Sequence, residues 1–538
     1  MTASSGRPGN AAEAGAAVPL KFDVVVVGAT PGGIAAAVAA ARLGRRAALI
    51  EYHRHIGGMA ASGLGKSDIE NRAAIAGLFR EFTDRVLTHY TDLYGPDSEN
   101  VALCRDGYRS EPSVAETVFS EMLANCGENV ALLCGLRLLA VHVEEGAVTA
   151  IEAADRSTAE VRRLEGGVFI DATYEGDLYA AAGAEFRVGR ESRDEHGEPH
   201  AGVVYFDYQT RRFLPGTTGA GDAALPAYTY RLCLTTEAEN SFRLVEPPPG
   251  YDRREYLGYF DDLAAGRLAG PRHLKPGRGY NPAHFDTLVR ALSVSDIPNR
   301  KTDVNINPRP LAFPFPEENR GYVEGDEDTR QGIRERHRNL SLGLLWFLQN
   351  DGEIPAGHRE LANQYHLPLD EFADNGHFPF QLYVREARRL VGEYTLTELD
   401  ITGPRVSGGS REHADSIAVG EFPIDSFPCH KRRPGDAAVL EGYIGMLEAE
   451  APYQIPYQIP YRIMLPRKID GLIVPVAAST THVAYSSIRL EPTWMALGQA
   501  AGVAAHLALR HEVAPRAIPV PELQRILISQ GQVIELPG

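Results

Sequence analysis

A glycine-containing turn between two apolar runs constrains the fold of this chain more than any other feature. Residues 24–51 read VVVVGATPGGIAAAVAAARLGRRAALIE. Residues 22–27 predict a strand buried on both faces, the alanine-rich residues 32–43 predict a helix that Gly44 ends, and residues 47–51 predict a second strand. This strand-turn-helix-strand order indicates the mononucleotide-binding half of a Rossmann-like α/β domain.

Each position of the turn has a physical task. Gly28 permits the tight turn, and Gly33 lets the helix pack closely on the strand. Gly32 lies in the first helical turn, where unpaired N–H groups and the helix dipole favour a phosphate. Thr30 stands where G-x-G-x-x-G has its second glycine, and its hydroxyl is able to donate to phosphate. Pro31 has no N–H and suits the start of a helix.

The acid and the loop after the second strand favour a flavin dinucleotide over NAD. Glu51 ends that strand and is placed to accept a hydrogen bond from a ribose hydroxyl, the alternative being a solvated acid. Residues 55–68, HIGGMAASGLGKSD, are rich in glycine. A flavin needs a chain that runs close to its pyrophosphate, ribityl chain and ring, although an ordinary flexible loop is the alternative. The residues of this loop that we expect to contact FAD are His55, Gly57, Gly58, Met59 and Gly63.

The order of the predicted segments along the chain indicates a cofactor domain that is assembled from both ends of the sequence. Residues 1–20 lack the basic and apolar runs of a signal peptide and predict a disordered tail. Residues 21–195 predict the first part of the FAD-binding domain, and residues 461–538 its completion. Residues 196–460, rich in Pro, Gly, Tyr and Asp in their first half, predict a loop-rich α+β substrate domain.

The periodicity of apolar residues predicts the strands and helices within these segments. Residues 130–164 predict short antiparallel strands, an inserted β-meander, and residues 166–173 a return to a buried strand of the parallel sheet. Residues 329–350 and 379–395 predict helices, and residues 471–479 another buried strand. The fold class is therefore α/β, with a Rossmann-like parallel sheet and an antiparallel meander.

The amino-acid composition limits the classes of partner that the chain is expected to bind. Lys and Arg total 54 against 71 Asp and Glu, a formal charge of −17, which disfavours nucleic acid and anionic membranes. The five cysteines form no C-x-x-C pair, which is typical of reduced thiols in a cytoplasmic protein. The apolar run from Ile34 is too short to span a bilayer, and no cluster has metal-ligand spacing. The oligomeric state stays open.

Motifs along nearly the whole chain after residue 20 resemble one family. The chain is similar to the FAD-dependent oxidoreductase family of the glutathione-reductase-like two-dinucleotide-binding superfamily, related to fumarate reductase and succinate dehydrogenase flavoproteins. In that family Thr30–Pro31 is the usual form of the turn. The stretches that carry the resemblance include HIGGM (55–59), FIDATYEGDLYAAAGAEFRVGRES (169–192), QLYVREARRLVGEYTLTE (381–398) and HVAYSSIRLEPTWMALGQAAG (482–502).

The resemblance implies further cofactor contacts. The strand that returns to the cofactor carries Ala172 and Thr173, followed by Tyr174 where many relatives have glycine. A helix from Glu491 to Gly502, which contains Gly498, would direct its N-terminus at the flavin N1–C2=O edge and stabilise the anionic reduced flavin, with core packing as the alternative. Leu138, in the predicted meander, is also expected to contact FAD. Succinate dehydrogenase flavoproteins tether FAD through a histidine in a comparable loop, but the spacing around His55 differs. Non-covalent FAD is therefore expected, with a covalent link through His55 as the alternative.

Four residues are candidates for the chemistry. His482 and Tyr485 lie between the last predicted strand and helix, and either is a candidate base for a substrate proton. Arg489 is a candidate partner for reduced flavin or a substrate oxyanion. Arg385 lies in VREARR, whose arginines a helix would align as a clamp for an anionic or polyhydroxylated substrate, or as partners of structural ion pairs.

These features predict an FAD-dependent oxidoreductase that oxidises a small polar substrate, carbohydrate-like or a specialised metabolite, by hydride transfer to flavin N5. The electron acceptor is oxygen or another carrier. One alternative is a flavin monooxygenase that uses oxygen and NAD(P)H, although no second glycine fingerprint follows a strand in the middle of the chain. The other alternative is a non-catalytic flavin-fold binding protein.

Overall fold

The computed structural model describes residues 19–207, 212–264, 294–305, 315–403, 410–430, 439–444 and 456–536. The predicted tail therefore falls almost wholly outside the described residues. The α-helices are α1 (Pro31–Arg42), α2 (Leu78–Tyr94), α3 (Glu99–Cys104), α4 (Pro112–Ala124), α5 (Asp177–Ala181), α6 (Arg193–His196), α7 (Gly258–Ala264), α9 (Glu327–Asn350), α10 (Ala356–Ala362), α11 (Glu398–Thr402), α12 (His482–Ile488), α13 (Glu491–His511) and α14 (Val520–Ser529). The strands are β1 (Leu20–Val27), β2 (Ala47–Glu51), β3 (Val130–Cys134), β4 (Leu136–Glu144), β5 (Ala147–Asp155), β6 (Val161–Asp171), β7 (Phe186–Arg187), β8 (Phe206–Asp207), β9 (Arg212–Phe213), β10 (Arg231–Thr235), β11 (Ser241–Phe242), β12 (Val294–Ile297), β13 (Lys301–Asn305), β14 (Leu367–Pro368), β15 (Arg389–Leu390), β16 (Ser416–Gly420), β17 (Tyr457–Pro460) and β18 (Leu472–Ile473).

The largest sheet of the described residues confirms the predicted fold class. Its strand order is β3-β2-β1-β6-β5-β4, with β18 also pairing to β6. Strands β3, β2, β1, β6 and β18 are parallel, whereas β5 and β4 are antiparallel. Alternate residues of β1 face opposite sides: Val24 and Val26 belong to the core under α1 and α13, and Val25 and Val27 to the core on the other face. The parallel strands thus end together at one edge of the sheet.

Two details of the predicted meander are wrong. Residues 130–133 belong to β3, which pairs in parallel with β2 at the sheet edge. The two strands predicted on either side of residue 165 are one strand, β6, whose first part pairs with β5 and whose last part pairs with β18. Gly166 and Gly167 do not form a turn there. They leave room for neighbours, because a Cβ on Gly166 would lie 2.9 Å from a methyl of Val25 and one on Gly167 would lie 2.5 Å from Leu509.

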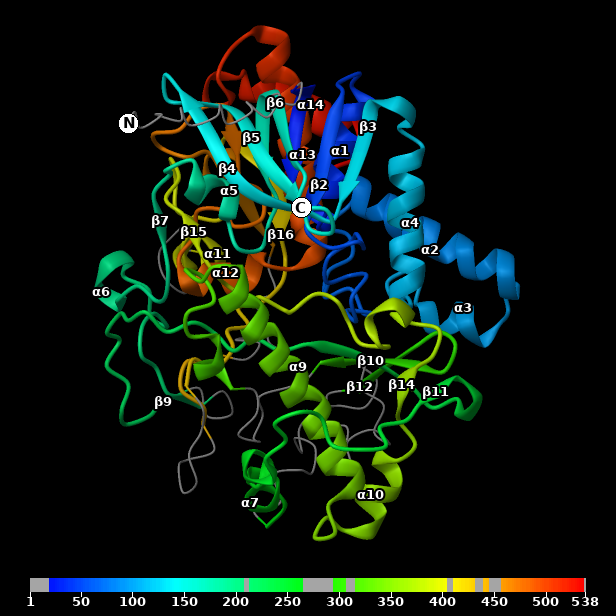
Figure 1. Ribbon diagram of the computed structural model, residues 1–538. Helices are drawn as coiled ribbons and strands as arrows, with labels where there is room; N and C mark the ends of the chain where they lie inside the picture. Colours follow the sequence, from blue (N-terminus) through cyan, green and yellow to red (C-terminus); the bar gives the residue numbers. More distant parts are fainter. Residues whose placement is uncertain are drawn as a thin grey trace, which may run out of the picture.

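Helices α1 and α13 cross at very short range beside the sheet (Figure 1). A Cβ on Gly498 would lie 1.9 Å from the carbonyl oxygen of Gly32, and one on Gly502 would lie 2.3 Å from that of Ala36. Gly498, expected to bind the cofactor, therefore makes the helix crossing possible. The C-terminal part of the chain also reaches this sheet through β18, shorter than the strand predicted at 471–479.

The opposite end of the molecule carries α9, α10 and the small antiparallel sheet β10-β13-β12 (Figure 1). Helix α9 confirms the prediction at 329–350. The helix predicted at 379–395 is wrong: this segment is extended, Tyr383 bridges to Thr229, and β15 pairs with β7. The side chains of Glu386, Arg388 and Arg389 bond to partners far along the chain, and this tertiary pairing overrides the helical spacing of VREARR.

Candidate cofactor and substrate site

The glycine turn joins β1 to α1 in a conformation that requires glycine. Gly28 has a φ of +97°, and a Cβ there would lie 2.8 Å from backbone atoms of Ala172. A Cβ on Gly33 would lie 1.9 Å from the Gly28 carbonyl oxygen. The turn is therefore held tightly between β1, α1 and the end of β6.

Thr30 acts as the N-cap of α1. Its Oγ1 accepts a hydrogen bond from the Gly33 N–H at 3.2 Å and donates one to the Ala172 carbonyl oxygen at 2.9 Å. Pro31 follows as the first helical residue. Because the hydroxyl hydrogen is engaged by Ala172, a phosphate at this turn would be held by backbone N–H groups and the helix dipole.

Glu51 ends β2 with its carboxylate buried against the turn. Oε2 accepts a hydrogen bond from the Ala29 N–H at 2.7 Å, and Oε1 accepts one from the His53 N–H at 2.8 Å. Burial raises the pKa of Glu51 to about 7, against the lowering effect of these backbone donors. The carboxylate is thus fixed at the sheet edge, in the position that the sequence predicts for a ribose contact.

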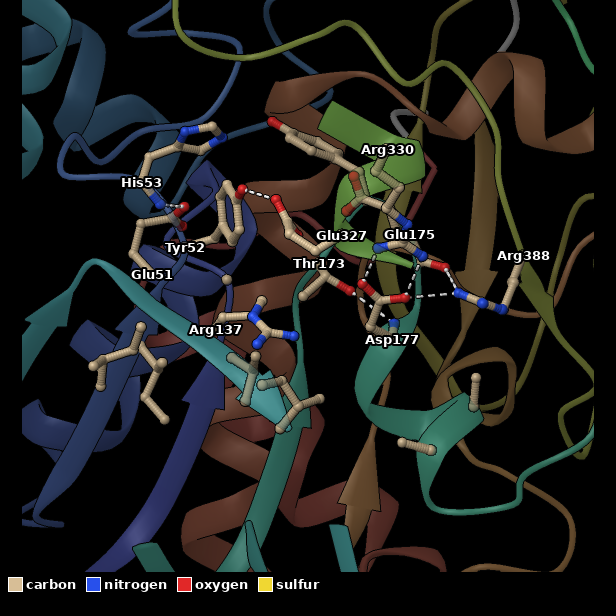
Figure 2. Close-up of a pocket in the computed structure, with 18 of the residues that line it drawn as sticks. Glu51, Tyr52, His53, Arg137, Thr173, Glu175, Asp177, Glu327, Arg330 and Arg388 are labelled. Atoms are coloured by element: carbon tan, nitrogen blue, oxygen red, sulfur yellow. Dashed lines mark hydrogen bonds and ion pairs between the residues drawn. The ribbon is translucent and has the colours of Figure 1, made fainter. Parts of the chain in front are cut away.

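A cavity of about 540 Å³ opens at the carboxyl ends of β1, β2 and β6. Ligands of open α/β sheets bind at this edge. Figure 2 shows Glu51, Tyr52 and His53 at one side of the cavity and Asp177, Arg330 and Arg388 at the other. The predicted cofactor residues that line it are Gly28, Thr30, Glu51, Leu138 and Thr173.

Side chains from α9 close the cavity opposite the sheet, and the sequence analysis missed them. Arg330 makes a two-pronged ion pair with Asp177, with distances of 2.6 and 2.8 Å. The Tyr52 hydroxyl donates to Glu327, and Arg334 donates to the Tyr52 oxygen at 3.0 Å. The i,i+4 spacing of Arg330 and Arg334 on one helical face was the available signal.

The glycines of the loop after β2 serve packing against protein. A Cβ on Gly57 would lie 2.8 Å from the ring of Phe119, one on Gly58 would lie 2.3 Å from the Tyr174 hydroxyl, and one on Gly63 would lie 1.8 Å from the first carbonyl oxygen of β10. All three glycines have positive φ. The loop is therefore pressed between α4, the end of β6 and β10.

His55 lies in this loop with both ring nitrogens facing carboxylates. Nδ1 is 3.1 Å from Glu116 and Nε2 is 3.0 Å from Asp374, and the ring stacks on Phe380 with centroids 5.0 Å apart. The hydrogen bond to Glu116 is the main cause that raises the pKa of His55 to about 9. The cavity lining at the sheet edge does not include His55.

Tyr174 connects the loop to the N-terminus of α13. Its hydroxyl accepts a hydrogen bond from the Met59 N–H at 3.0 Å and donates one to Glu491 Oε1 at 2.8 Å. Glu491 Oε2 is buried and has no partner among the described residues. Burial raises the pKa of Glu491 to about 8, so the carboxyl group carries a proton at neutral pH. A polar atom of a ligand could form a hydrogen bond with this unpartnered carboxyl oxygen at the start of α13.

His482 begins α12 and is held by a buried charge network. Its Nδ1 lies 2.7 Å from Glu386 Oε2, its Nε2 lies 3.3 Å from the Ser426 hydroxyl, and its backbone N–H donates to Glu191. Arg389 donates to both Glu386 and Glu191, at 2.9 and 2.6 Å. Burial acts to raise the pKa of Glu191, but the charge of Arg389 overcomes it and the pKa falls to about 2. Glu386 was not among the predicted site residues, because the segment 379–395 was predicted to be a helix.

The other three candidate residues lie near His482. Tyr485 is buried on the same short helix, and its hydroxyl has no partner among the described residues. Arg489 ends the helix and donates to the Tyr383 hydroxyl at 2.8 Å. Arg385 is fully buried on the extended segment and contacts the same Tyr383 ring. The structure thus brings all four together, in a cluster distinct from the lining of the 540 Å³ cavity.

A parallel sheet that ends in a glycine turn, an acid and a cavity defines a dinucleotide-binding protein of the Rossmann type. The chain belongs to the FAD dependent oxidoreductase family, whose model matches residues 23–527. It is therefore an oxidoreductase, and FAD is its cofactor.

Comparison with other proteins gives partial matches. No curated protein matches the chain. A flavin-dependent monooxygenase, PieE, is 18% identical over 32% of this chain and 34% of its own, with a TM-score of 0.23. The Sdh1 complex of Mycobacterium smegmatis is 12% identical over 32% and 42%, with a TM-score of 0.21. The anhydrotetracycline hydroxylase OxyS of Streptomyces rimosus is 15% identical over 32% and 38%, with a TM-score of 0.22. These matches span less than half of each solved chain.

The residues present fit FAD. The turn at Gly28 leaves the start of α1 beside the cavity, Glu51 faces the same cavity, and Glu491 offers an unpartnered carboxyl atom at the start of α13. Within the described ranges, no group of three or more His, Cys, Asp or Glu side chains is arranged to hold a metal ion. No helix in the part of the chain that the structure describes has the length and apolarity needed to cross a bilayer.

Proposed function

We propose that this enzyme oxidises a small polar molecule, a carbohydrate-like alcohol or a specialised metabolite, with His482 as the group that accepts the substrate proton. Oxidation of an alcohol removes a hydride from carbon and a proton from oxygen, and bound FAD would accept the hydride at N5. The observation that carries the proposal is the buried pair of His482 and Glu386, 2.7 Å apart.

Glu386 orients the His482 ring through the contact with Nδ1. The carboxylate accepts the Nδ1 proton, so the neutral ring presents an unprotonated Nε2. Once the ring accepts a proton at Nε2, the same carboxylate stabilises the imidazolium. A base oriented by a carboxylate in this manner contributes typically about 10²–10⁴-fold to a rate.

The surroundings of the pair keep its geometry fixed. Arg389 bonds Glu386 on one side and Glu191 on the other, and Glu191 accepts the backbone N–H of His482. His482 is only 4% exposed, which limits access of bulk water to Nε2. The Ser426 hydroxyl, 3.3 Å from Nε2, marks the position where a substrate hydroxyl would exchange its proton.

The electron acceptor in this reaction is oxygen or another carrier, and the compartment is the cytoplasm, in agreement with the free cysteines. Its partner is a small molecule, since the formal net charge of −17 disfavours polyanions.

Absorption spectra of the purified protein test the proposal. We expect flavin bands, release of the chromophore on denaturation, and bleaching by an alcohol in an anaerobic screen of polyols and specialised metabolites. His482→Gln should keep stoichiometric FAD but lower kcat/KM for that alcohol by about 10²–10⁴-fold.

Two matched variants complete the test. Glu386→Gln should reduce kcat/KM, because the amide cannot stabilise the imidazolium as a carboxylate does. Glu160→Gln, on an exposed turn, should leave kcat/KM unchanged. Full activity of His482→Gln would contradict the assignment of the base.

A further inference from the structure

Arg385 is a buried guanidinium group without a carboxylate partner. Its side chain is fully buried, and the hydrogen bonds that it makes within the described residues all go to neutral acceptors. Nη1 donates to the Ala227 carbonyl oxygen at 2.8 Å and to Thr229 Oγ1 at 2.9 Å, and Nη2 to Asn305 Oδ1 at 3.5 Å. Nε is buried and has no hydrogen-bond partner in the part of the chain that the structure describes. A buried charge in this state is costly unless a ligand completes it.

A second arginine and two aromatic rings share this position. The Arg385 Cζ lies 4.2 Å from the centroid of the Tyr383 ring and 3.7 Å from that of Phe427. The Arg489 Cζ lies 5.7 Å from both centroids, and its Nη1 donates to the Tyr383 hydroxyl. Two guanidinium groups thus surround one pair of rings, a setting in which they are weakly hydrated and present planar N–H edges.

The neighbouring charges compensate the buried charge of Arg385 only in part. Burial lowers the pKa of Arg385 to about 9, and repulsion from Arg489 and Arg231 acts in the same direction, against Tyr383 and Asp425. Arg231 is itself paired with Asp303 at 2.6 Å and lies 3.3 Å from Asp68. An anion next to Arg385 would relieve the repulsion between the arginines.

We infer that Arg385 and Arg489 form a subsite for the carboxylate of a hydroxy acid, an inference that rests on the proposed function. One segment joins this subsite to the proposed base: Ser426 contacts His482 Nε2, and its neighbours contact the two arginines, Phe427 through its ring and Asp425 through its carbonyl oxygen. In the proposed complex, a substrate with its hydroxyl at His482 would direct its carboxylate toward the arginine pair. A carboxylate is planar and matches the N–H edge of a guanidinium group.

Anion titrations of the FAD-loaded enzyme test the subsite. The probes are glycolate, lactate and gluconate, with lactamide as the neutral counterpart and inorganic phosphate as the competing oxyanion. The readouts are the flavin difference spectrum and the thermal midpoint. We expect the hydroxy acids to perturb both in the wild type, lactamide to perturb neither, and phosphate to bind more weakly than lactate.

Variants separate a binding role from a structural role. Arg385→Gln should keep its FAD and weaken the response to lactate by about tenfold or more, whereas Arg385→Lys should restore part of it. The midpoint of ligand-free Arg385→Gln should equal or exceed that of the wild type, because an unpaired buried charge is removed. A structural arginine would give a lower midpoint. Arg462→Gln is the control, since Arg462 is half-exposed and paired with Asp415, and it should respond as the wild type does.

Three results would overturn the inference: no wild-type response to any of the three hydroxy acids, tighter binding of phosphate than of lactate, or an unchanged response in Arg385→Gln. A preparation that binds no FAD would instead refute the proposed function. The thermal midpoint would still report on Arg385 in that case, so the two failures are distinguishable.

Discussion

At the scale of single residues, Thr30 and Gly28 have different roles in the turn that begins α1. Thr30→Gly removes the helix cap and the hydrogen bond to Ala172, so we expect the free energy of unfolding to fall by about 1 kcal/mol while FAD still binds. Gly28→Val should abolish FAD binding, because its side chain would overlap Ala172 at a positive φ. Chemical denaturation and FAD titration check both, and tight FAD binding by the valine variant would refute the turn assignment.

Glu51 gives a prediction about cofactor affinity and pH. Glu51→Gln should weaken FAD binding by about 10–100-fold, because the amide loses one acceptor and faces a backbone N–H with a second donor. Since burial raises the pKa of Glu51 to about 7 and a ribose hydroxyl donates to the ionised form, wild-type affinity should rise as the pH increases through 7.

Fluorescence titration of the apoprotein with FAD between pH 6 and 8 measures this dependence. The exposed Glu160→Gln variant is the control and should behave as the wild type. An affinity that is independent of pH in the wild type would argue that Glu51 does not contact the cofactor.

At the scale of elements, the crossing of α1 and α13 fixes the glycine turn from behind. Gly498→Ala puts a methyl group into the backbone of Gly32, so we expect the free energy of unfolding to fall by about 1–3 kcal/mol, with weaker FAD binding as α1 shifts. Gly332→Ala on the exposed face of α9 is the matched control: no atom of the described residues lies within 4 Å of the added Cβ, and the substitution should stabilise by about 0.5–1 kcal/mol. Equal effects of the two substitutions would contradict a role for the crossing.

Elements with a strong local pattern were predictable, and those set by distant contacts were not. The β1-turn-α1-β2 unit follows from its buried strand, glycines and alanine-rich helix. The segment at 379–395 has helical charge spacing, yet Arg389 and Glu386 bond to partners far along the chain. The same holds for the site: Glu51 could be placed from its position after a strand, whereas the contact of His482 with Glu386 depends on tertiary packing.

At the scale of the whole molecule, buried ionisable groups set a pH window for the apoprotein. Burial raises the pKa of Glu421 to about 7 and that of Glu198 to about 8, so the folded state holds these protons more tightly than the unfolded chain. Their contribution to stability is present at low pH and is lost as the pH rises from about 4.5 through 8. Burial lowers the pKa values of His53 and His337 to about 3, so their contribution is lost as the pH falls below 6.5. We expect the thermal midpoint of the apoprotein to be highest between about pH 4.5, above which the carboxyl contribution declines, and pH 6.5, below which the histidine contribution declines.

Glu491 is one of the groups expected to lower the stability of the apoprotein at high pH, and a variant tests its share. Above pH 8 the wild type must bury a carboxylate whose Oε2 has no partner among the described residues, whereas Glu491→Gln keeps the acceptor for the Tyr174 hydroxyl and never ionises. Because burial disfavours the ionised form, the midpoint of the wild type should drop more between pH 6 and 9 than that of the variant. Scanning calorimetry of both apoproteins at pH 6, 7.5 and 9 measures the difference. Parallel curves would mean that Glu491 is ionised throughout, and that the polar atom at the start of α13 is already satisfied without the cofactor.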